Sequence, residues 1–251
     1  MTRSVTRMTI EDAEHISEAK RAEIIASYPA HEVEARAKGI PVLGSGRVFP
    51  VTEESISVEP FAIPQHWAII GGLDFGWDHP TAGVLLAHDR DSDVVYVGAC
   101  YRRSKATPIE HAVTLSKWGD YPWAWPHDGL HQMKDGGLSF RDQYADAGMN
   151  MLPSHATHAS GGYGVEAGIS EMLTRMQSNR LKVFSHLSEW WEEFRLYHRQ
   201  DGKIVKLRDD VLDATRTALM MLRNAQTTAE LEFENEDWRD HGHGRSNTTG
   251  Y

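Results

Sequence analysis

The clearest pattern along this chain is a series of short apolar runs in its middle. Trp67–Asp74 is apolar up to its last residue, which predicts a buried strand that ends in an acid. Thr81–Ala87 and Asp93–Tyr101 predict two further strands, with turn residues between them at 89–92. Three consecutive strands with short connections favour an antiparallel meander.

Helical and extended segments alternate after this meander. Helices are expected at Pro108–Trp118 (with Thr107 as N-cap), Ser139–Ala147, Val165–Gln177, Ser188–His198 and Asp209–Asn224, and strands or extended pieces at Trp123–Trp125, Met149–Leu152, Leu181–Phe184 and Lys203–Leu207. The His-, Ser- and Gly-rich segment His155–Gly164 predicts a loop. We therefore expect an α/β fold, a mixed β-sheet flanked by helices.

Both ends of the chain are more polar than its middle. Residues 10–38 favour a helix that is too polar to form a core, and the turn-rich run Gly39–Gly46 marks a boundary. Residues 226–251 are acidic and rich in His and Gly. We expect residues 1–60 to form an arm or linker, 61–225 the folded domain and 226–251 a disordered tail.

Composition narrows the class of protein only in part. The net charge of −10 argues against an ordinary nucleic-acid-binding protein, but residues 61–225 hold 20 acids and 17 bases and are close to neutral. The single cysteine, Cys100, excludes an intrachain disulfide and a cysteine-rich zinc site. No apolar run is long enough for a membrane span and the N-terminus does not resemble a signal peptide, so we expect an intracellular protein.

Three acids stand where secondary-structure elements could converge. Asp74 ends the first strand of the meander, Asp128 follows a later strand, and Asp213 lies on the last helix. Ligand sites of open sheets gather at the carboxyl ends of strands. Clustered carboxylates repel one another, so such a group makes physical sense when Mg²⁺ or Mn²⁺ occupies it.

Each acid also has a simpler interpretation. An Asp after a strand is often a turn residue or a helix cap. Asp209 and Asp210 are explained by helix capping and the helix dipole, with metal binding as the alternative. Asp213 weighs more, because it interrupts an otherwise apolar helical stretch.

Two groups of cations are candidates for contact with phosphates. One group, Lys203, Lys206 and Arg208, precedes the last predicted helix, and the other, Arg102, Arg103 and Lys105, follows the third strand. Phosphate binding is plausible for both, and solvated surface charge is an equally good interpretation of the second.

Three stretches of the sequence resemble nuclease motifs of the large terminase subunits of tailed phages. Gly72–Ala82 resembles the first motif, a strand that ends in Asp and is followed by Pro-Thr-Ala. Trp125–Gly129 is similar to the second acidic motif, and Asp209–Ala218 to the third, an Asp-Ala-x-Arg helix. The resemblance extends over about residues 30–224.

The resemblance implies an RNase H-like fold and a metal-dependent endonuclease that cuts concatemeric double-stranded DNA during genome packaging in the host cytoplasm. By position, Asp74, Asp128 and Asp213 would bind two Mg²⁺ or Mn²⁺ ions, with Asp209 or Asp210 assisting. The implied partners are the terminase ATPase region, the small subunit and the portal protein.

One departure from the family separates this chain from a complete large subunit. No G-x-x-x-x-G-K-[ST] phosphate loop occurs in it, so we expect no ATPase activity, and residues 1–60 would be the linker from the missing ATPase region. The alternatives are a non-catalytic docking module for the portal or motor, and another RNase H-like nuclease of the resolvase or transposase type.

Overall fold

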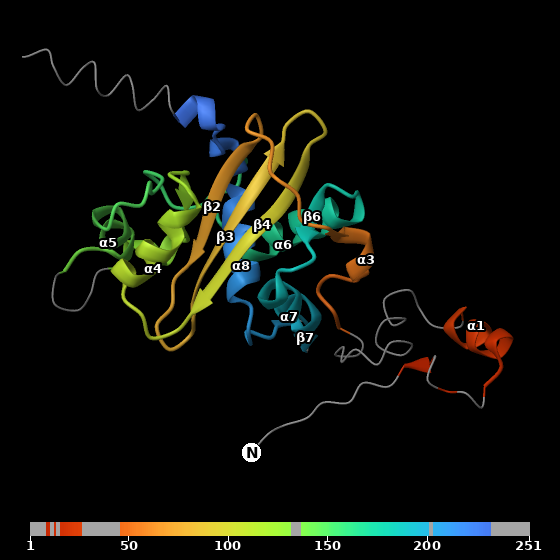
Figure 1. Cartoon of the computed structure of the whole chain (residues 1–251). Coiled ribbons are helices and arrows are strands. Elements are labelled where there is room, and N and C mark those ends of the chain that lie inside the picture. Colours follow the sequence, from red (N-terminus) through yellow and green to blue (C-terminus); the bar gives the residue numbers. More distant parts are fainter. Residues whose placement is uncertain are drawn as a thin grey trace, which may run out of the picture.

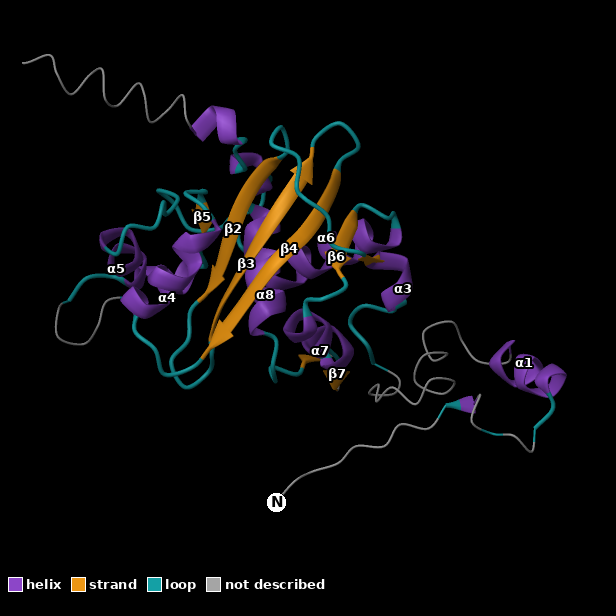
Figure 2. Cartoon of the chain, in the orientation of Figure 1, coloured by secondary structure: helices purple, strands orange, loops and turns teal. Residues whose placement is uncertain are grey.

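The protein is built around a six-stranded mixed sheet, with helices packed against it (Figures 1 and 2). The computed structural model describes residues 9–10, 13, 16–26, 46–131, 137–200 and 203–231. The strand order is β1-β6-β4-β3-β2-β5. This arrangement confirms the expected mixed sheet flanked by helices.

The three central strands form the predicted antiparallel meander. They are β2 (Ala68–Asp74), β3 (Thr81–Asp89) and β4 (Val94–Arg103). The first six residues of β2 are buried, because this strand is covered on both faces. Asp74, the last residue of β2, is the first to reach the edge of the core.

Three short strands extend the meander in parallel. β6 (Leu181–Phe184) pairs with β4, β1 (Ser57–Val58) with β6, and β5 (Trp123–Ala124) with β2. The strand predicted at Met149–Leu152 is wrong, since only Met151 makes an isolated bridge, to Trp123. One bridge cannot form a ladder, so this segment is a loop, in which Met149, Met151 and Leu152 are buried.

One face of the sheet is covered by α8 (Asp210–Met220), which contacts β2, β3 and β4 and lies behind the sheet in Figure 1. All eleven residues of this helix are buried. α6 (Val165–Gln177) and α7 (Ser188–Leu196) pack against α8, and α6 and β6 have the predicted bounds. In the part of the chain that the structure describes, the remaining helices are α1 (Glu18–Ala26), α3 (Glu53–Ile56), α4 (Pro108–Leu115) and α5 (Phe140–Asp146). The same ranges contain the 3₁₀ turns η3 (Ser116–Trp118), η4 (His127–Leu130) and η5 (Leu222–Asn224) and a small hairpin of β7 (Arg199–Gln200) and β8 (Lys203–Ile204).

Two glycines explain how closely the layers approach. A Cβ atom on Gly72 would lie 2.3 Å from the Ala214 carbonyl oxygen, and one on Gly71 would lie 2.4 Å from the Trp123 ring. Consecutive strand residues point to opposite faces. Gly72 therefore gives α8 direct access to β2, and Gly71 does the same for Trp123 on the other face.

The folded domain extends beyond the predicted bounds at both ends. Phe49 and Ile56 are buried in the main core, and β1 joins the sheet, so residues assigned to the linker belong to the domain. Gln226 exchanges two backbone hydrogen bonds with Ile69, and Glu230 pairs with Arg90. The predicted helix at 10–38 is described only in part, as α1, and residues 232–251 of the predicted tail lie outside the described residues.

Within the described ranges, no helix is both long and apolar enough to cross a membrane.

Candidate active site

The centre of the candidate site is Asp74, at the carboxyl end of β2. Burial raises the pKa of its carboxyl group well above the usual range. The negative charges of Asp213, Asp128 and Asp210 raise this pKa further, and the Arg216 guanidinium opposes the shift. The structure therefore places acids from three separate parts of the chain, in β2, η4 and α8, close enough to act on one another.

Asp128 reaches this site because β5 runs parallel to β2 and the two strands end at the same edge. It lies in η4, directly after β5, and its side chain reaches solvent. Its surroundings still raise its pKa, chiefly through desolvation. The neighbouring Gly129 is required for packing, since a Cβ there would lie 2.6 Å from the Trp125 ring and 2.7 Å from the Phe75 ring.

Asp213 is buried in the first turn of α8 and has two cationic neighbours. Arg216, one turn further along, lies 3.2 Å from its Oδ1 atom, and the Lys206 Nζ lies 3.5 Å from its Oδ2 atom. Gly168 of α6 makes room for Arg216, because a Cβ there would be 2.6 Å from the Arg216 Cγ. The charge of Asp213 is therefore partly balanced by protein groups.

Asp209 and Asp210 are buried beside Asp213, but they do not cap α8 as the sequence suggested. The Asp209 side chain makes no capping hydrogen bond, and its Oδ2 atom is buried without a hydrogen-bond partner. Burial raises the pKa of both carboxyl groups, and the charge of Asp213 raises each of them further. A cation would relieve both the repulsion and the unsatisfied oxygen.

The donor chemistry of this cluster fits a hard divalent cation. Mg²⁺ and Mn²⁺ prefer carboxylate oxygens, and the cluster supplies them from β2, η4 and α8. In the described residues, however, no three acidic, His or Cys side chains already have the spacing of a metal-binding group. Binding would therefore require the carboxylates to move closer together around the ion.

The candidate DNA-contacting cations lie in different environments. Arg102 is turned inward, where its guanidinium is 2.7 Å from the Glu193 carboxylate and 2.9 Å from that of Glu192, which leaves little of it for phosphate. Arg208 also pairs with Glu192 but is more than half exposed. Lys203, Lys206, Arg103 and Lys105 are exposed.

The loop predicted at His155–Gly164 places aromatic rings beside Asp128. The His127 ring stacks on that of Tyr163 at 4.8 Å, and the His155 ring meets both edge-on. His158 is held by the Gly164 carbonyl oxygen. The sequence indicated His155 and His158 as loop residues but gave no sign that His155 joins a ring cluster at the site.

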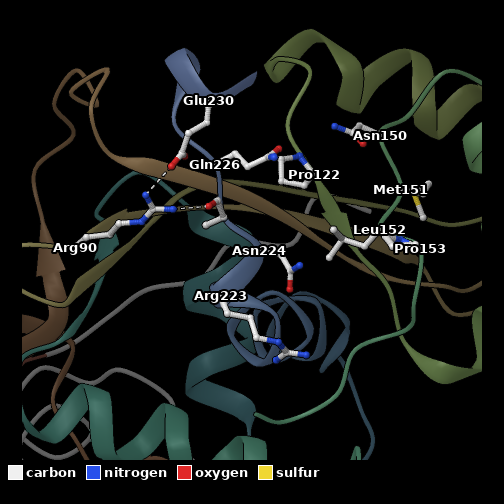
Figure 3. A pocket seen from close by; sticks show the side chains of 11 residues that line it. Arg90, Pro122, Asn150, Met151, Leu152, Pro153, Arg223, Asn224, Gln226 and Glu230 are labelled. Carbon is white, nitrogen blue, oxygen red and sulfur yellow. Dashed lines mark hydrogen bonds and ion pairs between the residues drawn. The ribbon is translucent and has the colours of Figure 1, made fainter. Parts of the chain in front are cut away.

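A separate pocket lies near the other end of α8, away from the acids. Figure 3 shows Arg90 there, with its guanidinium bound to Glu230 and to the Ala225 carbonyl oxygen. Arg223, Asn224 and Gln226 also line it. Because α8 runs from the acids at its N-terminus towards this pocket, the pocket is distinct from the acid cluster.

Comparison with known proteins decides the family. A family model for the terminase RNaseH-like domain matches residues 71–222, which include all five clustered acids. The chain belongs to this terminase family. A second model, for the N-terminal part of T4likevirus-type terminase large subunits, matches residues 1–56.

Individual relatives agree with this assignment. The chain is 48% identical over 237 residues to the terminase large subunit of Salmonella phage P22, and 50% identical over 222 residues to that of Enterobacteria phage LP7. These matches cover 94% and 88% of this terminase chain but 48% and 47% of the relatives, so the chain spans about half their length. The solved nuclease domain of the P22 large terminase matches with a TM-score of 0.69 and 47% identity, over 74% of this chain and 97% of that structure.

Glu193 and Tyr197 match a Glu-x-x-x-Tyr helix of the terminase family in sequence, but that resemblance gives Glu193 no role at the site. Glu193 is fully buried on α7, and its carboxylate accepts hydrogen bonds from the first turn of α8 and from Arg102. A glutamate within the amphipathic segment 188–198 would ordinarily be interpreted as solvated surface charge. Its contacts depend on residues about 20 and 90 positions away, which no local pattern reveals.

Proposed function

We propose that this chain is a metal-dependent endonuclease that cuts concatemeric double-stranded viral DNA during genome packaging. The observation that carries the proposal is the convergence of Asp74, Asp128 and Asp213 at one edge of the sheet. The P22 structure, 47% identical to this chain, is named as a nuclease domain, which supports the same activity here.

In the proposed reaction, Asp74, Asp128 and Asp213 would hold two divalent ions, Mg²⁺ or Mn²⁺, and Asp209 or Asp210 would assist. When bound, two such metal ions would activate a water molecule and stabilise the attacking and leaving oxygens of the phosphodiester. The protein's own part is to fix the carboxylates on three rigid elements. It also desolvates them, which strengthens their interaction with cations.

Exposed cations beside the acids would bind the DNA backbone. Lys206 is suited to this role because its ammonium group is exposed and lies 3.5 Å from the Asp213 carboxylate. A backbone phosphate bound there would be held next to the metal-binding acids. The proposed DNA-contacting residues are Lys203, Lys206, Arg208, Arg103 and Lys105.

The remaining assignments concern the whole packaging machine. We propose that residues 1–45 connect to an ATPase region, consistent with the N-terminal terminase model that matches residues 1–56. The ATPase region, the small subunit and the portal protein would be partners, in the cytoplasm of the host.

A docking role is the second candidate, and an apolar groove favours it. Trp77, Ile109 and Leu138 are each more than half exposed and line one groove between the loop after β2, α4 and α5. A protein partner could cover this groove, and the role could coexist with cleavage. Substitution of the three Asp residues would leave docking unchanged.

Cleavage of supercoiled plasmid tests the proposed nuclease. The wild-type chain should nick and linearise plasmid with Mn²⁺ or Mg²⁺ and not with EDTA. Asp74→Asn, Asp128→Asn and Asp213→Asn should each nearly abolish cutting, whereas Asp146→Asn, an exposed acid on α5, should not. Substantial metal-dependent cutting by one of the three variants would remove that residue from the site, and no cutting by a folded wild-type chain would favour docking or a nuclease that needs its motor.

A further inference from the structure

The N-terminus of α8 is capped by a residue of another helix. The Glu193 Oε2 atom, on α7, accepts hydrogen bonds from the backbone amides of Val211 at 2.7 Å and Leu212 at 3.1 Å. The first amides of a helix have no partner within it and need an acceptor from elsewhere. Asp209, at the N-cap position, makes no such bond, so Glu193 supplies it.

This arrangement leaves the acids of α8 available. One carboxylate oxygen of an Asp at the N-cap position commonly accepts a hydrogen bond from the first backbone amides of the helix. Because Glu193 binds these amides, Asp209 and Asp210 keep their carboxylates for other partners. The buried, unpaired Oδ2 atom of Asp209 is consistent with this division of roles.

Glu193 is itself held in place from the sheet. Its Oε1 atom accepts a hydrogen bond from the Arg102 Nη1 at 2.7 Å, and Arg102 lies near the end of β4. Glu192 fixes the other side of the same guanidinium at 2.9 Å. A fully buried carboxylate needs such a counter-charge, so the pair forms a defined bridge from β4 through α7 to α8.

A second tie between α7 and α8 lies one turn further along. The Trp190 indole donates a hydrogen bond of 3.1 Å to the Thr215 hydroxyl. Together with Glu193, it fixes both the position of α8 along its axis and the rotation about that axis. Asp213 directly follows Leu212, so its carboxylate is set by these contacts.

We propose that Glu193 is a positioning residue for the metal-binding acids, and that Arg102 holds its carboxylate against α8. The inference rests on the proposed nuclease function. Glu193 touches neither metal nor DNA in this role; it sets where Asp210 and Asp213 stand relative to Asp74. Arg102 accordingly serves the site through Glu193 and not by binding phosphate.

Glu193→Gln tests this role, because it keeps the size of the side chain and removes its charge. The measurements are Mn²⁺ binding by calorimetry and plasmid cleavage as a function of Mn²⁺ concentration, on the full chain. Residues that support metal ligands typically contribute about 10–100-fold to metal affinity. We expect the Kd for Mn²⁺ to rise by about 10-fold or more, and excess Mn²⁺ to restore most of the maximal cleavage rate.

Glu53→Gln is the matched control. Glu53 also pairs with an arginine of α7, Arg195, but on the side of α7 that faces α3. The Glu53→Gln variant should lose thermal stability to a degree similar to Glu193→Gln. Its Kd for Mn²⁺ should stay within about two-fold of wild type, well below the effect of about 10–100-fold typical of residues that support metal ligands. Arg102→Gln, at the rim of the site, is the second test variant if Glu193→Gln does not fold, and it should weaken Mn²⁺ binding in the same direction.

The outcomes separate this inference from the proposed function. If the wild-type chain binds Mn²⁺ and Glu193→Gln binds it equally well while melting earlier, Glu193 is only structural and the inference is overturned. If the wild-type chain neither binds Mn²⁺ nor cleaves DNA, the proposed function fails, and the inference with it. A loss of Mn²⁺ affinity in Glu53→Gln as large as in Glu193→Gln would also overturn it.

Discussion

Gly72→Ala should damage both the stability and the activity of this protein, for one geometric reason. The added Cβ would lie 2.3 Å from the Ala214 carbonyl oxygen, 2.7 Å from the Ala218 Cβ and 2.9 Å from the Ala218 amide nitrogen. Two of these atoms are helix backbone and cannot rotate away. α8 as a whole must therefore move away from β2.

The size of that movement follows from the contact distances. Real Cβ contacts are rarely shorter than 3.0–3.4 Å, so the 2.3 Å contact requires a shift of roughly 1 Å. Overpacking of this kind costs about 1–3 kcal/mol, which corresponds to a fall in Tm of roughly 3–10 °C for a domain of this size. A 1 Å misplacement of reacting groups can lower the rate by about 100-fold, and Asp213 moves with Ala214.

Urea unfolding and plasmid cleavage measure the two effects, with Gly98→Ala as the control. A Cβ on Gly98 would meet nothing closer than the Phe184 ring at 3.8 Å, so that variant should stay within about 0.5 kcal/mol of wild type and cleave normally. A Gly72→Ala variant as stable and as active as Gly98→Ala would contradict a steric role for Gly72.

Three further predictions concern single side chains. Asp74→Asn should stabilise the metal-free protein by about 1 kcal/mol at neutral pH. Burial, and after it the neighbouring acids, raise the pKa of Asp74. The stability that protonated Asp74 gives to the wild-type fold is therefore fully present below about pH 4 and is lost as the pH rises through that raised pKa. Urea titrations without metal should show that the difference in free energy of unfolding between Asp74→Asn and wild type disappears at acidic pH. Equal stability of the two proteins at all pH values would contradict the clustering of acids around Asp74. Lys206→Ala should weaken DNA binding and reduce the slope of log K against log salt concentration by about one, measured by fluorescence anisotropy at several salt concentrations. An unchanged slope would exclude a phosphate contact. Thr107→Ala breaks the capping box with Glu110 and should cost about 1 kcal/mol without altering cleavage, whereas a loss of cleavage would mean that α4 takes part in the site.

Local patterns were sufficient for the elements that carry the site. The apolar run into Asp74 predicted β2, and the amphipathic segments predicted α6 and α8. Asp128 was a candidate because it follows a predicted strand, and Asp213 because it interrupts an otherwise apolar helical stretch. Asp128 lies near Asp74 because β5 is parallel to β2, and Asp213 lies there because α8 packs against β2.

Long-range contacts account for what the sequence did not show. Met149–Leu152 has the composition of a strand, but only Met151 finds a bridging partner. β1 is two residues long, too short to produce a pattern. Arg102 was grouped with surface cations because its partner Glu193 lies 91 positions away, and the cap of α8 was assigned to its own acids because Glu193 is on another helix.

Anomalous diffraction from crystals soaked in Mn²⁺ would show whether Asp74, Asp128 and Asp213 bind metal ions. We expect two peaks about 4 Å apart between Asp74, Asp128 and Asp213, both lost in Asp213→Asn. Peaks elsewhere, or none at this edge of the sheet in well-soaked crystals, would contradict a metal-dependent nuclease centre at these three residues.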